Sequence, residues 1–396
     1  MRIALIADAF PPIRSSAAVQ LRDLSLEMVK QGHQPTVIIP SADLESPWSL
    51  DHMNGVQVLR LKAPRTKDIG YVKRTINEFM LPFVMLHNFR KSPFSEELWS
   101  GVVWYSPTIF LGPLASVLKK TSACRSYLII RDIFPEWAVD MGLLGRGLPY
   151  RFFKAIEHYQ YSVADVIGVQ TSSNLAYFDV WVSQSKRRVE VLQNWLADSP
   201  NIGSTIKIAD SILAGRTIFV YAGNMGVAQG MNIIIDLAER LYARRDLGFL
   251  FVGRGSDAKK MRHDAESRGL DNVLFYDEID PTEISGLYAQ CHIGIVALDP
   301  RHKTHNIPGK FLTYMQAGLP VLASINTGNN LVELITQENV GRVCTDNSVD
   351  TLEFLAKELV AEVSSSHNFD IQCKNLSKKL FSPEVAVTQI VSALNE

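Results

Sequence analysis

The sequence of 396 residues contains no long hydrophobic segment. Its longest uninterrupted apolar run, Met80 to Leu86, has seven residues and includes Pro82, whereas a helix that crosses a bilayer needs about 20 apolar residues. The apolar stretch between Met1 and Ala9 is too short for a secretory signal peptide. We therefore expect a protein that neither spans a membrane nor is exported, and that begins with a β-strand.

Cysteine and net charge are also scarce. Lys and Arg number 40 against 41 Asp and Glu, and a net charge of -1 gives no chain-wide attraction for nucleic acid. The four cysteines include no Cys-x-x-Cys pair, which argues against a zinc ribbon, a thioredoxin-type site and a disulfide framework, and favours a reducing cytoplasm. His302 and His305 lack a third ligand, so we expect no metal site.

Short apolar runs rich in Val and Ile alternate with longer segments of helical periodicity. In the first half these runs are 3–7, 36–39, 56–61, 102–105, 127–130, 166–169 and 189–192. In the second half they are 218–222, 249–252, 273–276, 293–297, 321–323 and 341–344. The alternation predicts two parallel sheets, each covered by helices on both faces.

The two halves are separated by a polar stretch near residues 198–207. We therefore predict an α/β protein with two doubly wound, Rossmann-like domains, 1–200 and 201–380, whose sites face each other across a cleft. Residues 381–396 contain a helix with Pro383 at its first position, and its packing is not readable from the sequence.

Three segments of the second half suggest an anion site at the start of a helix. The segment 221–230 places several glycines between a strand and a helix, and 251–255 ends the next strand with a glycine pair around Arg254. The third, 306–321, is a loop followed by a helix that opens near Pro308 and Gly309, beside Lys310. An ordinary strand-to-helix turn and a solvated surface arginine are the alternatives.

These segments resemble the donor half of GT-B glycosyltransferases of family four. The first half is similar to the branch that builds bacterial surface polysaccharides, including N-acetyl-fucosamine-type transferases, at 8–12, 31–37, 131–136 and 191–195. The resemblance covers nearly the whole chain. It implies a carboxyl-terminal domain that binds a nucleotide-sugar, an amino-terminal domain that binds the acceptor, and transfer with retention of anomeric configuration.

The resemblance also implies roles for individual residues. Donor-binding residues would be Gly223, Asn224, Gly226, Arg254, Tyr276, Ile279, Asn306, Pro308, Gly309, Lys310 and Thr313. A loop facing the donor would contain Pro12, Ser15 and Ser16, and catalytic residues would be Asp132, Arg131 and Glu136. Asp132 would orient hydroxyl groups, with Glu136 as the alternative base. A helix cap with a surface ion pair is the alternative for Arg131 and Asp132.

The sequence departs from the family at two places. His305 and Thr313 occupy the positions of two glutamates, and Asn224 and Gln229 occupy those of an arginine and a lysine that neutralise phosphate. Lys310 would then carry the neutralising charge. No Asp-x-Asp motif occurs, so we expect no metal and no cofactor, with the nucleotide-sugar as substrate.

Residues 60–91 combine eight basic residues with only two acidic ones and an aromatic stripe at helical spacing. Such a basic amphipathic helix is typical of docking to an anionic membrane surface. The residues that would contact lipid are Lys73, Arg74, Phe79, Phe83, Arg90 and Lys91. Packing of the stripe on the domain core is the alternative.

The sequence thus predicts a retaining, metal-independent glycosyltransferase, cytoplasmic and peripheral at the inner face of the plasma membrane. Its partners would be a nucleotide-sugar, by resemblance a UDP-N-acetyl sugar, and a lipid-diphosphate-linked saccharide acceptor, with no nucleic acid. Two other functions stay open. A GT-B nucleotide-sugar 2-epimerase would need acid and base carboxylates in the cleft, and a noncatalytic partner in a polysaccharide assembly complex would explain the two missing glutamates.

Overall fold

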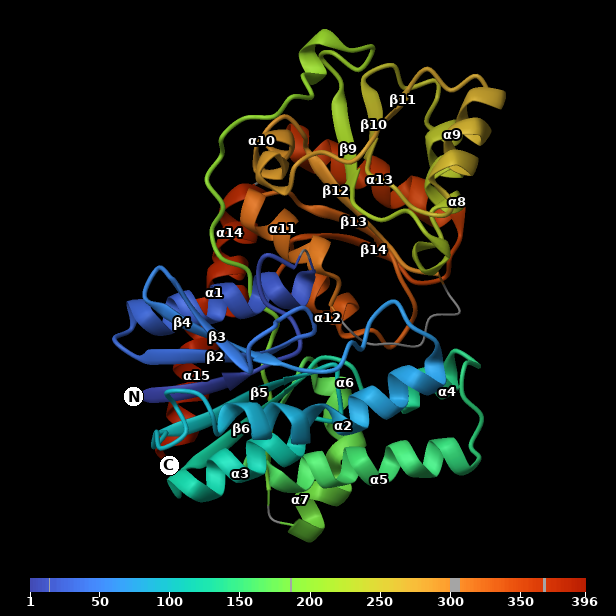
Figure 1. The fold of residues 1–396 in the computed structure, drawn as a ribbon. Coiled ribbons are helices and arrows are strands. Elements are labelled where there is room, and N and C mark those ends of the chain that lie inside the picture. Colours follow the sequence, from blue (N-terminus) through green and yellow to red (C-terminus); the bar gives the residue numbers. More distant parts are fainter. Residues whose placement is uncertain (14, 186, 300–306, 366–367) are drawn as a thin grey trace. The chain divides into compact units, whose positions relative to one another are not determined.

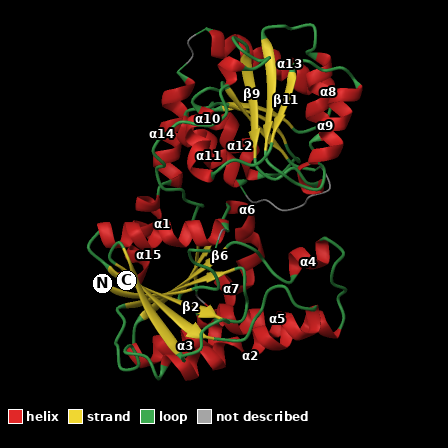
Figure 2. Cartoon of the chain, turned by 45° about the horizontal axis from the view of Figure 1, so that its top comes forward, coloured by secondary structure: helices red, strands yellow, loops and turns green. Residues whose placement is uncertain are grey.

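The computed structural model describes all residues except 14, 186, 300–306 and 366–367, and the chain forms two compact units. The first unit consists of Met1–Trp195 together with Pro383–Glu396, and the second of Leu196–Ser382. In each unit a sheet lies between layers of helices (Figures 1 and 2). The chain therefore builds most of the first unit, then the whole second unit, and returns to the first.

The first unit has an eight-stranded sheet in the order β3-β4-β2-β1-β5-β6-β7-β8. Its strands are β1 (Arg2–Ile6), β2 (Gln34–Ser41), β3 (Trp48–Met53), β4 (Val56–Lys62), β5 (Gly101–Ser106), β6 (Arg125–Ile130), β7 (Val166–Val169) and β8 (Arg188–Val191). Its longer helices are α1 (Ser16–Lys30), α2 (Tyr71–Phe89), α3 (Gly112–Ser122), α5 (Leu148–Val163) and α15 (Pro383–Asn395). Shorter ones are α4 (Glu136–Asp140), α6 (Ser172–Leu175), η1 (Ala176–Phe178) and α7 (Asp179–Ser185).

The sheet of the first unit is not entirely parallel, which corrects the sequence prediction. The additional strand β3 pairs antiparallel with β4, with Met53 opposite Val56. Asn54 and Gly55 form the two-residue turn, and their φ values of 48° and 87° match a type of turn that suits hairpins. The Asn-Gly pair was a readable signal, but β3 is only partly buried and lacks the apolar run used to find the other strands.

Alternating side chains of β1 contribute to cores on both faces of this sheet. Ile3 and Leu5 belong to the core that α1 and α15 cover, whereas Ala4 and Ile6 belong to the core beneath α2 and α3. Both faces are therefore buried, as the apolar character of the strands predicts.

Helix α15 answers what the sequence left open about residues 381–396. It packs against α1 and β6, and Val387, Ile390 and Leu394 are buried there. Gln389 Nε2 also donates hydrogen bonds to Glu190 Oε1 at 2.7 Å and to the carbonyl of Val191 at 2.9 Å. The last helix is therefore part of the amino-terminal unit.

The second unit has a six-stranded parallel sheet in the order β11-β10-β9-β12-β13-β14. Its strands are β9 (Thr217–Ala222), β10 (Leu247–Val252), β11 (Val273–Tyr276), β12 (Ile293–Ala297), β13 (Val321–Ser324) and β14 (Gly341–Cys344). Its α-helices are α8 (Asn232–Arg240), α9 (Ala258–Ser267), α10 (Ile284–Tyr288), α11 (Gly309–Ala317), α12 (Asn330–Gln337), α13 (Val349–Ser364) and α14 (Phe369–Phe381). The 3-10 helices are η2 (Ile208–Asp210), η3 (Val227–Gln229) and η4 (Pro281–Glu283).

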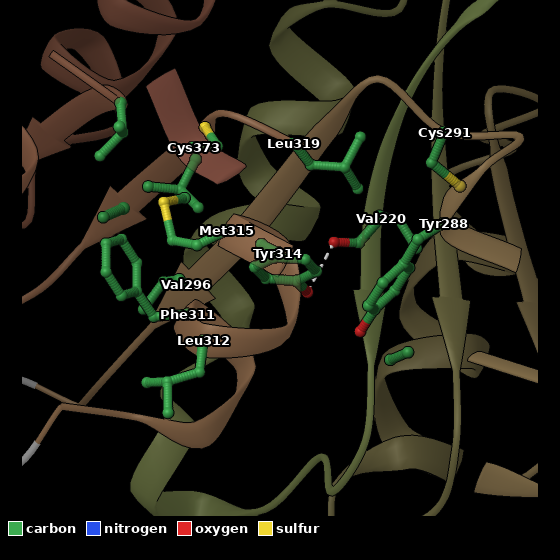
Figure 3. Close-up of a cluster of buried hydrophobic side chains, with 14 of the residues drawn as sticks. Val220, Tyr288, Cys291, Val296, Phe311, Leu312, Tyr314, Met315, Leu319 and Cys373 are labelled. Atoms are coloured by element: carbon green, nitrogen blue, oxygen red, sulfur yellow. Dashed lines mark hydrogen bonds between the residues drawn. The ribbon is translucent and has the colours of Figure 1, made fainter. Parts of the chain in front are cut away.

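Helix α11 is fixed to this sheet by its buried face. Phe311, Tyr314 and Met315 are buried in the core, and the hydroxyl of Tyr314 donates a 3.0 Å hydrogen bond to the carbonyl of Val220 in β9 (Figure 3). Tyr314 also lies against Tyr288 of α10, with ring centroids 5.0 Å apart. The start of α11 is thereby held at a defined place beside the end of β9.

Among the described residues, none of the helices has the length and hydrophobicity needed to cross a membrane.

Candidate active site

The second unit contains a cavity of about 390 Å³ where strands β9 and β10 end and the segment after β11 begins. Parallel strands bring their carboxyl ends to one edge of a sheet, where doubly wound folds bind ligands. The cavity is lined by Ala222, Gly223, Asn224, Val252, Gly253, Arg254, Glu278, Ile279, Pro281, Ile284, Tyr288 and Thr313. The predicted donor residues Gly223, Asn224, Arg254, Ile279 and Thr313 therefore lie in one place.

Close contact between two loops explains why glycines stand at the cavity edge. Gly253 has a φ of 137°, and a Cβ atom there would lie 2.2 Å from the carbonyl oxygen of Gly223. The NH of Gly223 donates to the carbonyl of Val252 at 2.8 Å. The backbones after β9 and β10 are thus joined, and any side chain larger than hydrogen at Gly253 would separate them.

Neutral groups close the loop between Asn224 and Gln229. Gln229 Oε1 accepts a 3.0 Å hydrogen bond from the NH of Gly226 and a 3.3 Å hydrogen bond from Nδ2 of Asn224. Gly226 precedes η3, and its own backbone is in the extended region. Neither Asn224 nor Gln229 supplies positive charge to an anion in the cavity.

Lys310, in the first turn of α11, is not among the residues that line the cavity, but its side chain reaches Gly223, which is. Its side chain approaches Gly223 so closely that a Cβ atom there would lie 2.9 Å from Cε of Lys310, and its Nζ lies 4.6 Å from the ring centroid of Tyr221. Burial lowers the pKa of Lys310 to about 8. No described residue forms an ion pair with it. A bound anion would therefore be its natural counter-charge.

Arg254 and Glu278 form an ion pair at the cavity, with 3.0 Å between Nε and Oε2. Their side chains are 81% and 55% exposed, so solvent screens their attraction and the pair is weak. Arg254 follows β10 and Glu278 follows β11, which are neighbouring strands. The pair can therefore separate at little cost when a ligand offers each group a better partner.

The remaining residues predicted to bind the nucleotide-sugar lie close to the cavity or outside the described part of the chain. Thr313 Oγ1 donates to the carbonyl of Lys310 at 2.8 Å, which holds the first turn of α11, and Tyr276 accepts a 3.1 Å hydrogen bond from the NH of Gly253 through its carbonyl. Pro308 is the N-cap of α11 and Gly309 is its first residue. Asn306 and His305 lie outside the described residues.

The first unit carries Arg131 and Asp132 directly after β6. Arg131 is buried, and its Nη1 donates a 2.9 Å hydrogen bond to the carbonyl of Leu192, while its guanidinium lies 4.7 Å from the ring centroid of Trp195. Asp132 is exposed, and α4 begins only at Glu136 with Pro135 as its N-cap, so Asp132 does not cap this helix. The surrounding protein nevertheless raises the pKa of Asp132 by desolvation, against the attraction of Arg131. Arg131 thus positions the loop from which Asp132 projects.

Glu136 is already engaged within the first unit. Its Oε1 accepts a 2.7 Å hydrogen bond from the hydroxyl of Tyr150 and lies 3.3 Å from Nζ of Lys154. Lys154 also pairs with the buried Glu157 at 2.6 Å. A carboxylate with these partners is less available as a base than Asp132.

The loop after β1 contains Pro12, Ser15 and Ser16. Ser15 is the N-cap of α1, and its Oγ accepts a 3.2 Å hydrogen bond from the NH of Ala18, while Pro12 and Ser16 are exposed. The same loop contains Asp8, whose surroundings in the fold the sequence did not reveal. One carboxylate oxygen of Asp8 is buried without a hydrogen-bond partner, and burial raises its pKa despite the charges of Lys67 and Arg74.

Helix α2 exposes the aromatic stripe that the sequence predicted. Phe79 and Phe83 are 43% and 48% exposed, and only another face of the helix, with Leu81 and Met85, is buried. Packing on the core therefore does not account for the stripe. The exposed surface continues onto α5, because the ring centroids of Phe79 and Phe152 are 6.0 Å apart.

The basic residues of α2 and of the two positions after it differ in their surroundings. Lys73, Arg90 and Lys91 are exposed, whereas Arg74 forms an ion pair with Glu78 at 2.9 Å between Nε and Oε1. The sequence did not reveal this pair as such, although the spacing of four residues on a helix was a signal for it.

Two Rossmann-like units, the second with a cavity at its strand ends, are the parts of a GT-B fold. Residues 216–362 match the family described as "Glycosyl transferases group 1". The chain is 24% identical to the "Probable glycosyltransferase WbjE" of Pseudomonas aeruginosa over 334 residues, 83% of this chain and 78% of that protein. It is 29% identical over 194 residues to the "Putative colanic acid biosynthesis glycosyl transferase WcaI" of Escherichia coli K12, a match covering 44% of each chain.

Solved structures agree on the fold. Sucrose-phosphate synthase from Thermosynechococcus elongatus superposes with a TM-score of 0.69 at 15% identity, over 99% of this chain and 97% of that one. WaaG, a glycosyltransferase involved in lipopolysaccharide biosynthesis, superposes with a TM-score of 0.62 at 16% identity, over 98% of this chain and 99% of that one. These similarities confirm the predicted GT-B fold class and the predicted enzyme class, a glycosyltransferase.

Proposed function

We propose that this glycosyltransferase retains the anomeric configuration and moves a sugar from a UDP-N-acetyl sugar to a lipid-diphosphate-linked saccharide in bacterial surface-polysaccharide biosynthesis. The choice of pathway is supported by WcaI, whose name assigns it to colanic acid biosynthesis, and by WaaG, which acts in lipopolysaccharide biosynthesis. The choice of UDP and of an N-acetylated sugar is supported by the resemblance alone.

The observation that carries the donor assignment is the position of Lys310 at the glycine loop. A partly buried ammonium beside Gly223, with no carboxylate partner among the described residues, suits a diphosphate. Next to it, Ile279, Pro281 and Ile284 give the cavity an apolar wall of the kind that accommodates a flat base.

In the proposed reaction, the bond between the anomeric carbon and the β-phosphate oxygen breaks, and a bond to the acceptor oxygen forms on the same face of the sugar. The acceptor proton passes to the departing phosphate. Lys310 and Arg254 stabilise the charge that develops on that phosphate, and Asp132 of the first unit orients the acceptor hydroxyl. We further propose that this charge stabilisation by side chains makes a metal ion unnecessary.

The donor proposal is tested with a thermal-shift panel of UDP-, GDP- and dTDP-sugars, because a ligand that binds only the folded protein raises its melting temperature. We expect UDP-N-acetyl sugars to stabilise the protein most. Equal stabilisation by GDP- and UDP-sugars would overturn the choice of base. The panel is repeated in EDTA, which should leave the UDP shift unchanged; a loss of the shift in EDTA would overturn metal independence.

We also propose that the exposed apolar face of α2, with Lys73, Arg90 and Lys91, docks the protein to an anionic membrane surface. The support is an exposed stripe that continues onto α5, within a segment of eight basic and two acidic residues. A lipid-linked acceptor would be reached from such a position.

A further inference from the structure

Among the described residues that line the proposed donor cavity, Glu278 is the only carboxylate. It follows β11, beside the apolar wall formed by Ile279 and Pro281. Its side chain is 55% exposed and touches Arg254, so its burial is too slight for a structural role in the core. A carboxylate at the mouth of a binding cavity is instead available to accept hydrogen bonds from a ligand.

The other polar groups of the cavity are less suited to accept such bonds. Thr313, Asn224 and Tyr288 offer only neutral oxygens as acceptors, which form weaker hydrogen bonds than a carboxylate does. The guanidinium of Arg254 can only donate. A ligand with neighbouring hydroxyl groups beside an apolar ring would therefore find its acceptor in Glu278.

We propose that Glu278 accepts hydrogen bonds from the 2′- and 3′-hydroxyl groups of the donor ribose, and that donor binding separates Glu278 from Arg254, whose guanidinium then contacts the diphosphate. This inference rests on the proposed binding of a nucleotide-sugar in this cavity. It assigns a specificity-determining role to Glu278: the enzyme should prefer ribonucleotides to 2′-deoxyribonucleotides.

When the ion pair separates, Glu278 and Arg254 would each gain a new partner from the donor. A vicinal diol supplies two O–H donors to one carboxylate, and a diphosphate supplies anionic acceptors to one guanidinium. The exposed ion pair that is lost contributes little. Removal of the 2′-hydroxyl leaves the carboxylate with one unsatisfied oxygen in the complex, and sites built to bind a hydroxyl discriminate strongly against analogues that lack it.

The test is calorimetric titration of the full chain with UDP and with 2′-deoxy-UDP. We expect the wild-type protein to bind UDP at least about tenfold more tightly, as a hydrogen bond to a charged group implies. In Glu278→Gln this preference should fall below about threefold through a loss of UDP affinity, while 2′-deoxy-UDP binds as before or more tightly because Arg254 is released. Asp277→Asn is the matched control, since Asp277 is adjacent, exposed and paired with Arg262 outside the cavity lining.

Each possible failure has a distinct meaning. If UDP does not bind the wild-type protein, the proposed donor site is wrong, whatever Glu278 does. If UDP binds but 2′-deoxy-UDP binds equally well, or if Glu278→Gln weakens both ligands alike, the ribose assignment is overturned and the donor site stands. If Glu278→Gln loses affinity for UDP-sugars but not for UDP, Glu278 contacts the transferred sugar. That result would also overturn the ribose assignment. If Asp277→Asn lowers the preference for UDP as much as Glu278→Gln does, the change in surface charge explains the loss and the ribose assignment is overturned.

Discussion

Lys310 is the residue whose environment says most about its role. Burial disfavours the charged form of Lys310, and the ring of Tyr221 is only a weak partner for its ammonium, so a bound anion would stabilise that ammonium further. Because its pKa in the free protein is about 8, a bound diphosphate should raise that pKa and take up a proton at slightly alkaline pH. Binding and protonation are then one linked equilibrium.

Replacing Lys310 by Ala should weaken UDP binding by about 1.5–3 kcal/mol, the usual contribution of a hydrogen bond to a charged group. In the wild-type protein, calorimetry across pH should find UDP affinity constant below the pKa of about 8 and falling about tenfold per pH unit above it, because the neutral amine must first be protonated. Lys310→Arg stays charged at these pH values and should remove the pH dependence. A wild-type affinity that does not change above pH 8 would contradict the assignment.

Asp132 is expected to act on the acceptor and not on the donor. Asp132→Asn keeps the shape but removes the charge, so turnover of the active UDP-sugar should fall by about 100-fold or more while UDP affinity stays near wild type. Because desolvation raises the pKa of Asp132, wild-type activity that needs the carboxylate should be lost as the pH falls through that raised pKa, and Asp132→Asn should lack this limb. Asp140→Asn, exposed at the end of α4, is the control. Full activity in Asp132→Asn would contradict this prediction and make Glu136 the candidate base.

The sequence predicted those site residues whose type and neighbours along the chain are distinctive. It did not predict site residues whose interest depends on what surrounds them in the fold. The glycines at 223 and 253 and the lysine at 310 stand out because their chemistry fits an anion at a helix start. Asp8 and Glu278 do not, since an Asp or Glu that follows a strand is common and has no distinctive spacing. Their interest comes from a buried oxygen in one case and a cavity wall in the other, which only tertiary structure reveals.

At the scale of elements, buried strands were predictable and the edge hairpin was not. Apolar runs such as 3–7 and 218–222 correspond to β1 and β9, because strands buried on both faces need continuous apolar sequence. The edge strand β3 contains Asp51 and His52, both exposed, so its pattern resembles a loop. Helix α2 was predictable as an amphipathic helix. The sequence could not decide whether its aromatic stripe faces the core or the solvent, because that depends on which face of the helix packs against the domain.

The exposed stripe of α2 leads to a prediction about lipid. The purified protein should co-sediment with vesicles rich in anionic lipid, not with neutral vesicles, and high salt should release it. Changing Lys73, Arg90 and Lys91 to Ser should weaken this binding by about 3 kcal/mol, at about 1 kcal/mol for each basic residue near the surface. Arg74 is left in place because it pairs with Glu78.

Two further variants separate charge from apolar contact on α2. Replacing Lys259, Lys260 and Lys378 by Ser makes the same charge change on exposed positions of the second unit and should not affect sedimentation. Replacing Phe79 and Phe83 by Ser should weaken binding even at low salt, because it removes exposed apolar area. Sedimentation that survives both α2 variants would place the docking surface elsewhere.

For the whole molecule, the return of the chain at Pro383 makes the first unit depend on the last helix. Ile390→Ala removes a fully buried side chain from α15 and should lower the stability of the first unit by about 2–5 kcal/mol. The melting transition of the first unit should shift, whereas the transition that UDP stabilises should not. Ser392→Ala, exposed on the same helix, is the control. A shift of the UDP-stabilised transition instead would mean that the two units unfold together.

The same return of the chain has a consequence during synthesis. When the first 195 residues leave the ribosome, the face of their sheet that includes Leu5 and Val103 still lacks α15, and it stays incomplete until the last residues are made. At about 5–20 residues per second, synthesis of the second unit lasts on the order of ten seconds or more. The second unit is continuous in sequence and can fold during that interval. The part of the protein that is made first is therefore the last to be finished, and chaperones would meet it as a half-covered sheet.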